Sequence, residues 1–473
     1  MIGTLTFALG AAAWLALGAA VPDGPVGAKV RWGAEQRLTT DPGASLLTYN
    51  FARTAAVDDS GRLHAVWYDS RGGAPHVYYR RSLASGWEPE RRLSEGVDDQ
   101  HPSVATAGSS VFVIWHGVNG NGLDVFLRRS LDGGATWQPV AILTSSGKAA
   151  HASVAASGRF VHVVWGDVRH GTAEIYWRRS DDGGASWEEE RRLSDLPFES
   201  WVPSVAAAGE DVWVAWVDLR DGNEEEYVKV SRDAGDHWTS DTRLTVNGAD
   251  SWAPSIVLSS GVAHVSWFDR RDAGVGHADV EAQLDAILAL MGLPYTAAPP
   301  PDPHTYYLPP FMARVEEKQR RIQDGLAAWV ASGGDPARME GELREFERRM
   351  RDWAMGWEIY YARSTDGGRS WSPEVRLTSA SGASARPSVA VDGENVFIVW
   401  FDGRDDDFEI YFKQSRDGGE TWLPDLRLTE AAGDSAHPTV AARGGVVHVL
   451  WHDHRDGNAE IYYRRGLTAK RLR

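Results

Sequence analysis

The chain has 473 residues and a formal net charge of −17, from 66 acidic and 49 basic residues. This charge argues against nucleic acids and anionic membranes as partners, because both would repel such a surface. The absence of cysteine excludes disulfides, thiolate metal sites, cysteine nucleophiles and a lipid anchor on cysteine.

Residues 1–20 form an uncharged apolar run with Gly18 and Ala20 where a signal peptidase cleaves. This pattern predicts a signal peptide, and therefore a secreted or extracytoplasmic protein of the periplasm or cell surface. The alternative is an uncleaved N-terminal anchor, because the run is nearly long enough to span a bilayer. No later stretch is apolar enough to cross a membrane, so we expect no further span.

One sequence unit recurs through the rest of the chain. It holds four short segments with the alternation typical of β-strands, separated by Gly-rich turns. The second segment ends in a marker tryptophan, and these markers are Trp67, Trp115, Trp165, Trp216, Trp267, Trp400 and Trp451. They lie 48 to 51 residues apart except for one gap of 133. Four-stranded units of this length are typical of propeller blades.

The last unit lacks its fourth strand, and a matching strand stands at the other end of the chain. Residues 32–39 read WGAEQRLT, similar to WSPEVRLT at 371–378. A strand donated from the N-terminus would close the ring and leave no free sheet edge. We therefore predict an all-β fold, a seven-bladed β-propeller at residues 30–466. Its four-stranded blades are expected at 50–94, 101–144, 151–194, 202–245, 253–378, 386–429 and 437–466 plus 31–39.

The one long gap predicts an α-helical insertion in blade five, at residues 274–356. Helical patterns cover residues 278–293 and 311–332. A third helix should begin at Asp335 and Pro336, an N-cap followed by a proline at the first helical position. The insertion is expected on the face that carries the loops between blades. It is either a helical unit that packs on itself, or a lid or contact for a protein partner.

Two short motifs recur with the strands. Five units carry S-x-D-x-G-x-x-W between the third and fourth strands, and the motifs end at Trp137, Trp187, Trp238, Trp371 and Trp422. Ser and Asp can bond backbone amides within such a turn, so we expect a role in folding. Six units carry W-x-D-x-R after the second strand, beginning with Asp69 and Arg71. Its recurrence favours a structural role, and the alternative is a ring of charge on the ligand face.

Positions that differ between units are better functional candidates. The residue 14 before each marker opens the innermost strand at the channel mouth, and these residues are Arg53, His101, His151, Val202, Ala253, Arg386 and His437. Five of the seven are cationic or titratable, so we predict that they bind a ligand. One residue earlier, Trp201 and Trp252 replace the Gln or Ala of other units. These rings either stand exposed and stack on sugars, or pack under the insertion.

The S-x-D-x-G-x-x-W turns resemble the Asp boxes, or BNR repeats, of the sialidase (neuraminidase) family. The resemblance covers nearly the whole chain outside the insertion and the N-terminal run. In that family the arginine of an R-I-P motif binds the carboxylate of sialic acid, and here Arg53-Thr54-Ala55 stands at that place. Arg71 lies near a second family arginine, and Arg386 would supply another. The resemblance implies recognition of an anionic sugar.

For an enzyme, the resemblance implies an Asp acid/base and a Tyr nucleophile activated by Glu. The corresponding candidates in this sequence are Asp69, Tyr49 and Glu199. Residues 405–407 carry acids whose spacing matches no known calcium loop, so we predict neither a metal nor a cofactor. Three hypotheses follow: a propeller that binds a glycan or another anionic ligand, an exo-acting sialidase-type glycoside hydrolase, and an interaction scaffold that uses the insertion.

Overall fold

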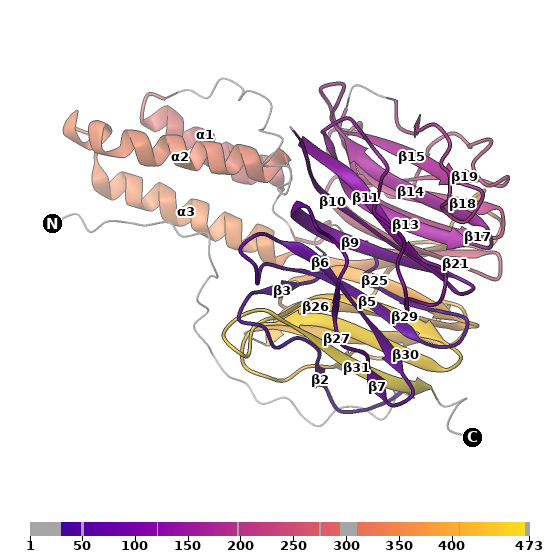
Figure 1. Cartoon of the computed structure of the whole chain (residues 1–473). Coiled ribbons are helices and arrows are strands. Elements are labelled where there is room, and N and C mark those ends of the chain that lie inside the picture. Colours follow the sequence, from indigo (N-terminus) through magenta and orange to yellow (C-terminus); the bar gives the residue numbers. More distant parts are fainter. Residues whose placement is uncertain are drawn as a thin grey trace.

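The computed structural model describes residues 30–48, 52–120, 122–195, 198–273, 276–293, 310–405 and 407–468. It confirms the seven-bladed β-propeller, built from seven antiparallel sheets (Figure 1). The predicted signal peptide or anchor lies outside the described residues. In the described part of the chain, no helix is long and apolar enough to cross a membrane.

Blade one is the least regular, because its innermost and outermost strands are each divided in two. It comprises β3 (Ser45–Leu46), β4 (Ala55–Val57), β5 (Leu63–Asp69), β6 (His76–Leu83), β7 (Gly86–Trp87) and β8 (Arg91–Arg92). Blade two has four strands, β9 (Val97–Ala107), β10 (Ser110–Asn119), β11 (Gly122–Ser130) and β12 (Ala141–Ile142). Blade three has β13 (Ala149–Ser157), β14 (Phe160–Asp167), β15 (Glu174–Ser180) and β16 (Arg191–Arg192).

The remaining blades repeat this order of strands. Blades four and five comprise β17 (Ser200–Ala208), β18 (Asp211–Asp218), β19 (Glu225–Ser231) and β20 (Thr242–Arg243), then β21 (Ser251–Ser259), β22 (Val262–Asp269), β23 (Glu358–Ser364) and β24 (Val375–Arg376). Blades six and seven comprise β25 (Ser384–Asp392), β26 (Asn395–Asp405), β27 (Asp407–Ser415) and β28 (Leu426–Arg427), then β29 (Ser435–Arg443), β30 (Val446–Asp453), β31 (Glu460–Thr468) and the N-terminal β1 (Val30–Trp32) and β2 (Gln36–Arg37).

The predicted closure of the ring is confirmed. Strand β1 pairs antiparallel with β31, with Val30 opposite Thr468, and β2 pairs further along the same strand. The Thr39 hydroxyl donates to the carboxylate of Glu460 and accepts the backbone N–H of Ile461 at 2.8 Å. The same hydroxyl–carboxylate bond occurs in blades three to six, at Ser194–Glu174, Thr245–Glu225, Thr378–Glu358 and Thr429–Glu409. The N-terminal segment therefore replaces the missing fourth strand in full.

The hydrophobic core lies between neighbouring blades. All seven marker tryptophans are buried, and each stacks on an aromatic ring of the third strand, as Trp165 does on Tyr176 with ring centroids 6.0 Å apart. One apolar cluster joins Val164 of blade three to Val212 and Trp216 of blade four. Because each blade buries apolar residues against a neighbour on both sides, no blade is complete without the ring.

The innermost strands begin before the predicted blade boundaries. In blades three to seven these strands start at residues 149, 200, 251, 384 and 435, each two residues earlier than predicted. The cause is a β-bulge in every one of them. On β13 the pairing steps from Ala150 to Ser153 while β14 steps only from Gly166 to Val164. In these five blades the predicted first residue thus lies in a bulge.

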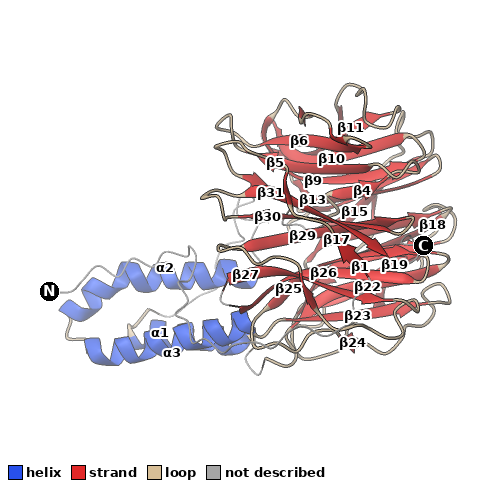
Figure 2. Ribbon diagram, turned by 90° about the horizontal axis from the view of Figure 1, so that it is seen from below, coloured by secondary structure: helices blue, strands red, loops and turns tan. Residues whose placement is uncertain are grey.

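Three helices form the predicted insertion, α1 (His277–Leu290), α2 (Pro310–Ala331) and α3 (Pro336–Met355), between β22 and β23. They project from one end of the strands, away from the blades (Figure 2). Asp335 caps α3 by accepting the N–H of Ala337 at 3.0 Å. The helices share a core that includes Leu284, Val315, Ile322 and Phe346. The insertion therefore packs on itself, and its role as a lid or partner contact stays a prediction.

The closure of the ring can be tested at Thr39. A Thr39→Val variant keeps the shape of the side chain but leaves the buried Glu460 carboxylate and the Ile461 N–H without this partner. We expect its free energy of unfolding in urea to fall by about 1–3 kcal/mol. The neighbouring Thr40 is exposed, so Thr40→Val is the matched control and should stay within about 0.5 kcal/mol of wild type. Equal effects of the two substitutions would contradict this account.

Candidate functional site

The bulges carry an unusual backbone conformation at the channel mouth. Six of the seven predicted mouth residues have φ between 50° and 63°, namely His101, His151, Val202, Ala253, Arg386 and His437. This left-handed region is uncommon outside glycine and is rarest for a β-branched residue such as Val202. A proline follows the bulged residue in five of the six blades. Proline fits a bulge because it has no N–H to contribute to the ladder.

Five mouth residues come from consecutive blades, in the order six, seven, one, two and three, and those of blades six, seven, two and three stand on bulges. Arg386 donates from Nη1 to Nδ1 of His437 at 3.2 Å. The rings of His101 and His151 have centroids 6.4 Å apart. Arg53 completes this arc from blade one, and we refer to these five residues as the mouth arc. Val202 and Ala253 of blades four and five are buried and add no charge to the mouth.

The arginines, rather than the histidines, give the mouth arc its charge. Burial lowers the pKa of His101 and of His437 well below the usual value, and neighbouring imidazoles and Arg386 lower both further. Burial likewise places the pKa of His116 and of His452 at about 3. These four rings are neutral near pH 7. His101 and His437 can therefore contact a ligand through hydrogen bonds rather than charge, and their role in ligand binding stays a prediction.

Arg53 crosses the channel. Its Nη2 donates to the backbone carbonyl of Ile256 in blade five, which lies on the far side of the ring from blade one. Burial lowers the pKa of the Arg53 guanidinium to about 10. The group therefore keeps its positive charge at neutral pH. Together with Arg386 it gives the mouth two fixed cations.

A small pocket opens between blades six, seven and one beside Arg386. Its lining includes Thr48, Thr54, His437 and Thr439, and its volume is about 20 Å³, room for one water-sized group. The side chains of Thr54 and Thr439 are almost fully buried, yet their hydroxyl oxygens make no hydrogen bond within the protein. Buried hydroxyls normally have a partner. The pocket is thus lined by an arginine and by threonines, side-chain types that can bind a small polar or anionic group.

Trp201 and Trp252 lie beside the mouth but inside the protein. They are only 5% and 9% exposed. The two rings meet edge to face with centroids 5.2 Å apart, and Trp252 also contacts Phe268. Phe268 in turn packs on Trp357, where the chain returns from the insertion. Of the two alternatives, exposed stacking surfaces are therefore wrong, and both rings belong to a buried aromatic cluster.

Asp69 and Arg71 make their contacts within their own blade. Asp69 is fully buried and accepts from Ser45 at 2.6 Å and from Arg71 at 2.8 Å. Arg71 also pairs with Glu90, which directly precedes the outer strand β8, and lies 4.2 Å above the ring of Tyr78. The same arrangement of arginine over tyrosine recurs in five further blades, at Arg169, Arg220, Arg271, Arg404 and Arg455. This supports the structural interpretation of the W-x-D-x-R motif rather than a ligand role for Arg71.

Of the two other catalytic candidates, the structure describes only Glu199. Tyr49 lies outside the described residues. Glu199 stands just before β17, which carries Val202 to the mouth. Burial raises the pKa of Glu199, and Arg314 of α2 opposes this shift. Within the described ranges, no group of three or more His, Asp or Glu side chains is arranged to hold a metal ion.

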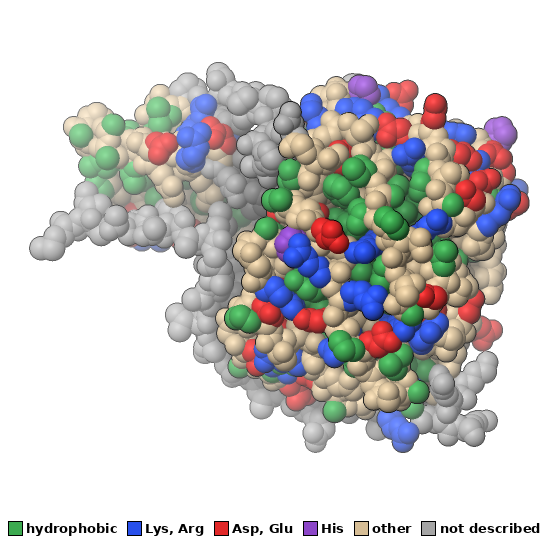
Figure 3. Space-filling model, viewed as in Figure 1, with side chains coloured by type: hydrophobic (Ala, Val, Ile, Leu, Met, Phe, Trp, Pro, Cys, Tyr) green, Lys and Arg blue, Asp and Glu red, His purple; other side chains and the backbone are tan. Residues whose placement is uncertain are grey.

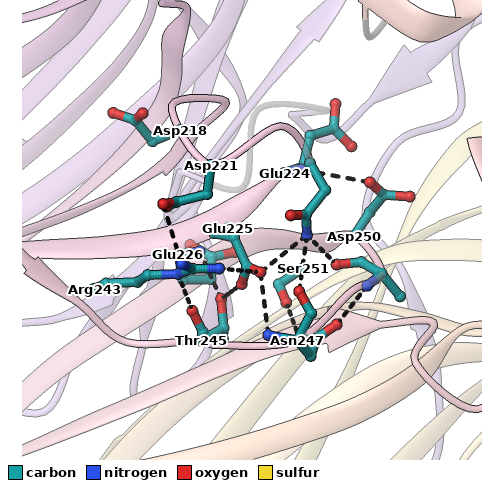
Figure 4. A network of polar contacts seen from close by, with 12 residues as sticks. Asp218, Asp221, Glu224, Glu225, Glu226, Arg243, Thr245, Asn247, Asp250 and Ser251 are labelled. Carbon is teal, nitrogen blue, oxygen red and sulfur yellow. Dashed lines mark hydrogen bonds and ion pairs between the residues drawn. The ribbon is translucent and has the colours of Figure 1, made fainter. Parts of the chain in front are cut away.

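Three further charged residues, which the sequence analysis did not identify, lie at the junction of blades four and five. Glu224, Glu226 and Arg270 are almost fully buried there. Figure 4 shows the two glutamates on either side of Glu225, within a network that includes Arg243 and Thr245. The signal in the sequence was the replacement of an apolar repeat position by an acid. The unpartnered hydroxyls of the mouth pocket had no such signal.

Comparison with known proteins shows similarity in fold. No protein-family model and no curated protein matches the chain. Trypanosoma rangeli sialidase, solved with 2,3-difluoro-KDN, matches with a TM-score of 0.42 at 11% identity, over 81% of this chain and 55% of the sialidase chain. The present chain thus spans about half the length of that structure.

Two other structures match over more of their own length. The polysaccharide lyase Uly1 has a TM-score of 0.52 at 9% identity, over 92% of this chain and 99% of the lyase. The α-L-arabinofuranosidase Arb93A of Fusarium graminearum has a TM-score of 0.43 at 12% identity, over 76% of this chain and 90% of the enzyme. At these identities the likeness is one of fold.

The neutral state of His116 and His452, whose ring centroids lie 5.1 Å from His101 and 4.7 Å from His437, can be tested by NMR. His116 and His452 have pKa values of about 3 because burial disfavours the imidazolium ion. We expect their ring signals to stay constant between pH 8 and pH 5, while an ordinary exposed histidine titrates near pH 6.5. The signals can be assigned with His116→Gln and His452→Gln variants. Titration of either ring between pH 6 and 7 would show that these histidines do carry charge at the mouth.

Proposed function

We propose that this protein binds an anionic carbohydrate at the channel mouth, with Arg386 holding the acidic group. The pocket beside Arg386 carries this proposal, because it joins a guanidinium to the unpartnered hydroxyls of Thr54 and Thr439. A carboxylate accepts hydrogen bonds from both kinds of donor, and bonds from a charged donor are the stronger ones. The full-length match in fold to a polysaccharide lyase supports a carbohydrate as the ligand.

The charge of the rest of the molecule restricts the binding of anions to sites such as this pocket. The chain has a net charge of −17, and on the face seen in Figure 3 acidic and basic side chains are interspersed. An anion is therefore attracted only where cations outnumber acids. Arg53 and Arg386 lie close to the same axis, and the lining of the pocket contains no carboxylate. If the N-terminal run directs export, this site faces extracytoplasmic glycans.

A glycoside hydrolase is the second candidate function, and Glu199 is the residue that favours it. Burial raises the pKa of its carboxyl group, as a general acid requires. Glu199 is, however, absent from the lining of the pocket beside Arg386. Recognition without cleavage is therefore the better supported function.

Binding can be tested by titration calorimetry with oligosaccharides that end in a sialic or uronic acid, against neutral counterparts. We expect binding of an acidic sugar that weakens with added salt. An Arg386→Gln variant should bind at least tenfold more weakly, since a hydrogen bond to a charged group contributes about 1.5–3 kcal/mol and 1.4 kcal/mol equals a factor of ten. Arg369→Gln, which removes an exposed charge in a turn of blade five, is the matched control and should bind like wild type.

The same ligands separate the two candidate functions. Release of product from a fluorogenic sialoside, abolished by Arg53→Ala and by Glu199→Gln, would establish the hydrolase in place of the binding protein. Equal affinity of wild type and Arg386→Gln for every acidic sugar would refute the role given to the pocket.

A further inference from the structure

Three charged residues break the repeat at one place, the junction between blades four and five. Glu226 occupies a position of β19 where the other blades carry Val77, Val125, Ile175, Ile359, Ile410 and Ile461. Glu224 stands two residues earlier, where they carry Pro75, Leu123, Ala173, Trp357, Phe408 and Ala459. Arg270 follows the Asp of the W-x-D-x-R motif, where the repeat otherwise has Ser70, Val168, Leu219, Gly403 and His454.

Asp250 joins two of these residues at the junction. Its Oδ1 accepts the backbone N–H of Glu224 at 3.4 Å, and its Oδ2 lies 3.7 Å from Nε of Arg270. The Arg270 guanidinium lies 5.3 Å from the centre of the Trp357 ring. Figure 4 shows Glu224 and Asp250 next to each other, across the network from Arg243. All four of the charged residues Glu224, Glu226, Asp250 and Arg270 are at most 3% exposed.

Glu226 is the least compensated of the four. Its side chain is fully buried, and neither carboxylate oxygen makes a hydrogen bond within the protein. The adjacent Glu225, by contrast, accepts from Arg243 and Thr245. Burial raises the pKa of Glu226 well above the usual value, and the nearby acids Glu225, Asp269 and Glu224 raise it further. The protonated form is therefore the one that this environment accommodates.

The neighbouring acids are shifted in the same direction. Burial and then Asp250 raise the pKa of Glu224 well above the usual value, against the attraction of Arg270 and of Arg314. Burial raises the pKa of Asp250 to about 6, with Asp269 and Glu225 adding to the shift and Arg270 opposing it. Three carboxyl groups at one junction thus bind protons more tightly in the folded protein than in water.

The helical insertion stands on this junction. The chain enters it from β22 through Arg270 and returns at Trp357. Arg314 of α2 is close enough to lower the pKa of Glu224 and of Glu199, and Asp279 of α1 acts on Arg270. Any loosening of the junction would therefore also loosen the base of the insertion.

We propose that the junction of blades four and five is a proton-operated latch, in which Glu224, Glu226 and Asp250 hold the base of the insertion against the propeller while they are protonated. When the three acids ionise, their buried charges favour an open state in which water reaches them. Strand β21 begins at Ser251, directly after Asp250, and carries Ala253 at the mouth, so the open state also loosens the wall of the channel mouth at blade five.

The direction of the pH dependence follows from linkage. A carboxyl whose pKa is raised in the closed state stabilises that state fully below its ordinary pKa, near 4, and this contribution is lost as the pH rises through the raised value. For Asp250 this window runs from about 4 to about 6. The windows of Glu224 and Glu226 likewise begin near the ordinary pKa and end at values raised well above it. The closed state is thus favoured in acid.

Hydrogen exchange followed by mass spectrometry on the full chain, corrected for the intrinsic exchange rate, tests the latch between pH 5 and pH 8.5. We expect protection of residues 225–231, 251–259 and 358–364 to fall at least tenfold over this range, because each pKa unit of difference shifts the equilibrium tenfold. The equivalent strand of blade three, residues 174–180, has Ile175 in place of Glu226 and is the internal control. Equal pH dependence of the two blades would overturn the proposal.

Variants that restore the repeat identify the groups responsible. Glu226→Ile and Glu224→Ala insert residues that other blades carry at these positions, and both should retain protection at pH 8 at least tenfold better than wild type. Should either fail to fold, Glu226→Gln removes the charge with little change in shape and should act in the same direction. Arg314→Gln removes a cation that favours ionised Glu224 in the closed state, so this variant should open further than wild type at high pH. Unchanged pH profiles in the glutamate variants would refute the latch.

Discussion

The structure depends on the need of every blade for a neighbour on both sides. The marker tryptophans and the valines around them are buried between blades, so a free end would expose a full apolar sheet face. The donated N-terminal strand removes that end. Its Thr39 makes the same bond to Glu460 that Ser194, Thr245, Thr378 and Thr429 make in their own blades. Closure in turn fixes how the innermost strands of the seven blades face each other at the mouth.

Against this regular frame, the positions that differ between blades carry the chemistry. Asp69 and Arg71 illustrate the regular part, since equivalents in five further blades place arginine over tyrosine in the same way. The irregular part is divided around the ring. Blades six, seven, one, two and three supply the mouth arc, whereas blades four and five supply the buried acids and the insertion. The propeller is symmetric in its scaffold and asymmetric in its polar groups.

The features that recur in every blade could be predicted from the sequence, whereas several features of single blades could not. Blade number, closure and the three helices were predictable because periodic apolar patterns and the Asp335–Pro336 cap are local signals. The burial of Trp201 and Trp252 was not predictable, because it depends on Phe268 and Trp357. Trp357 lies about a hundred residues beyond Trp252 in the sequence. The bulges were signalled by the recurring X-Pro pairs, but without the pairing register those prolines do not reveal that the preceding residue adopts a positive φ.

Burial acts differently on the two kinds of base at the mouth, and this difference explains why arginine carries the charge there. Desolvation removes the charge of His116 and His452 at neutral pH, because an imidazole begins with a pKa near 6.5. The same kind of shift leaves Arg53 with a pKa of about 10, well above neutrality. The charge of the mouth is therefore fixed over the range in which proteins work. At the junction of blades four and five, the same desolvation brings Asp250 to about 6, so the two halves of the ring respond to pH in different ways.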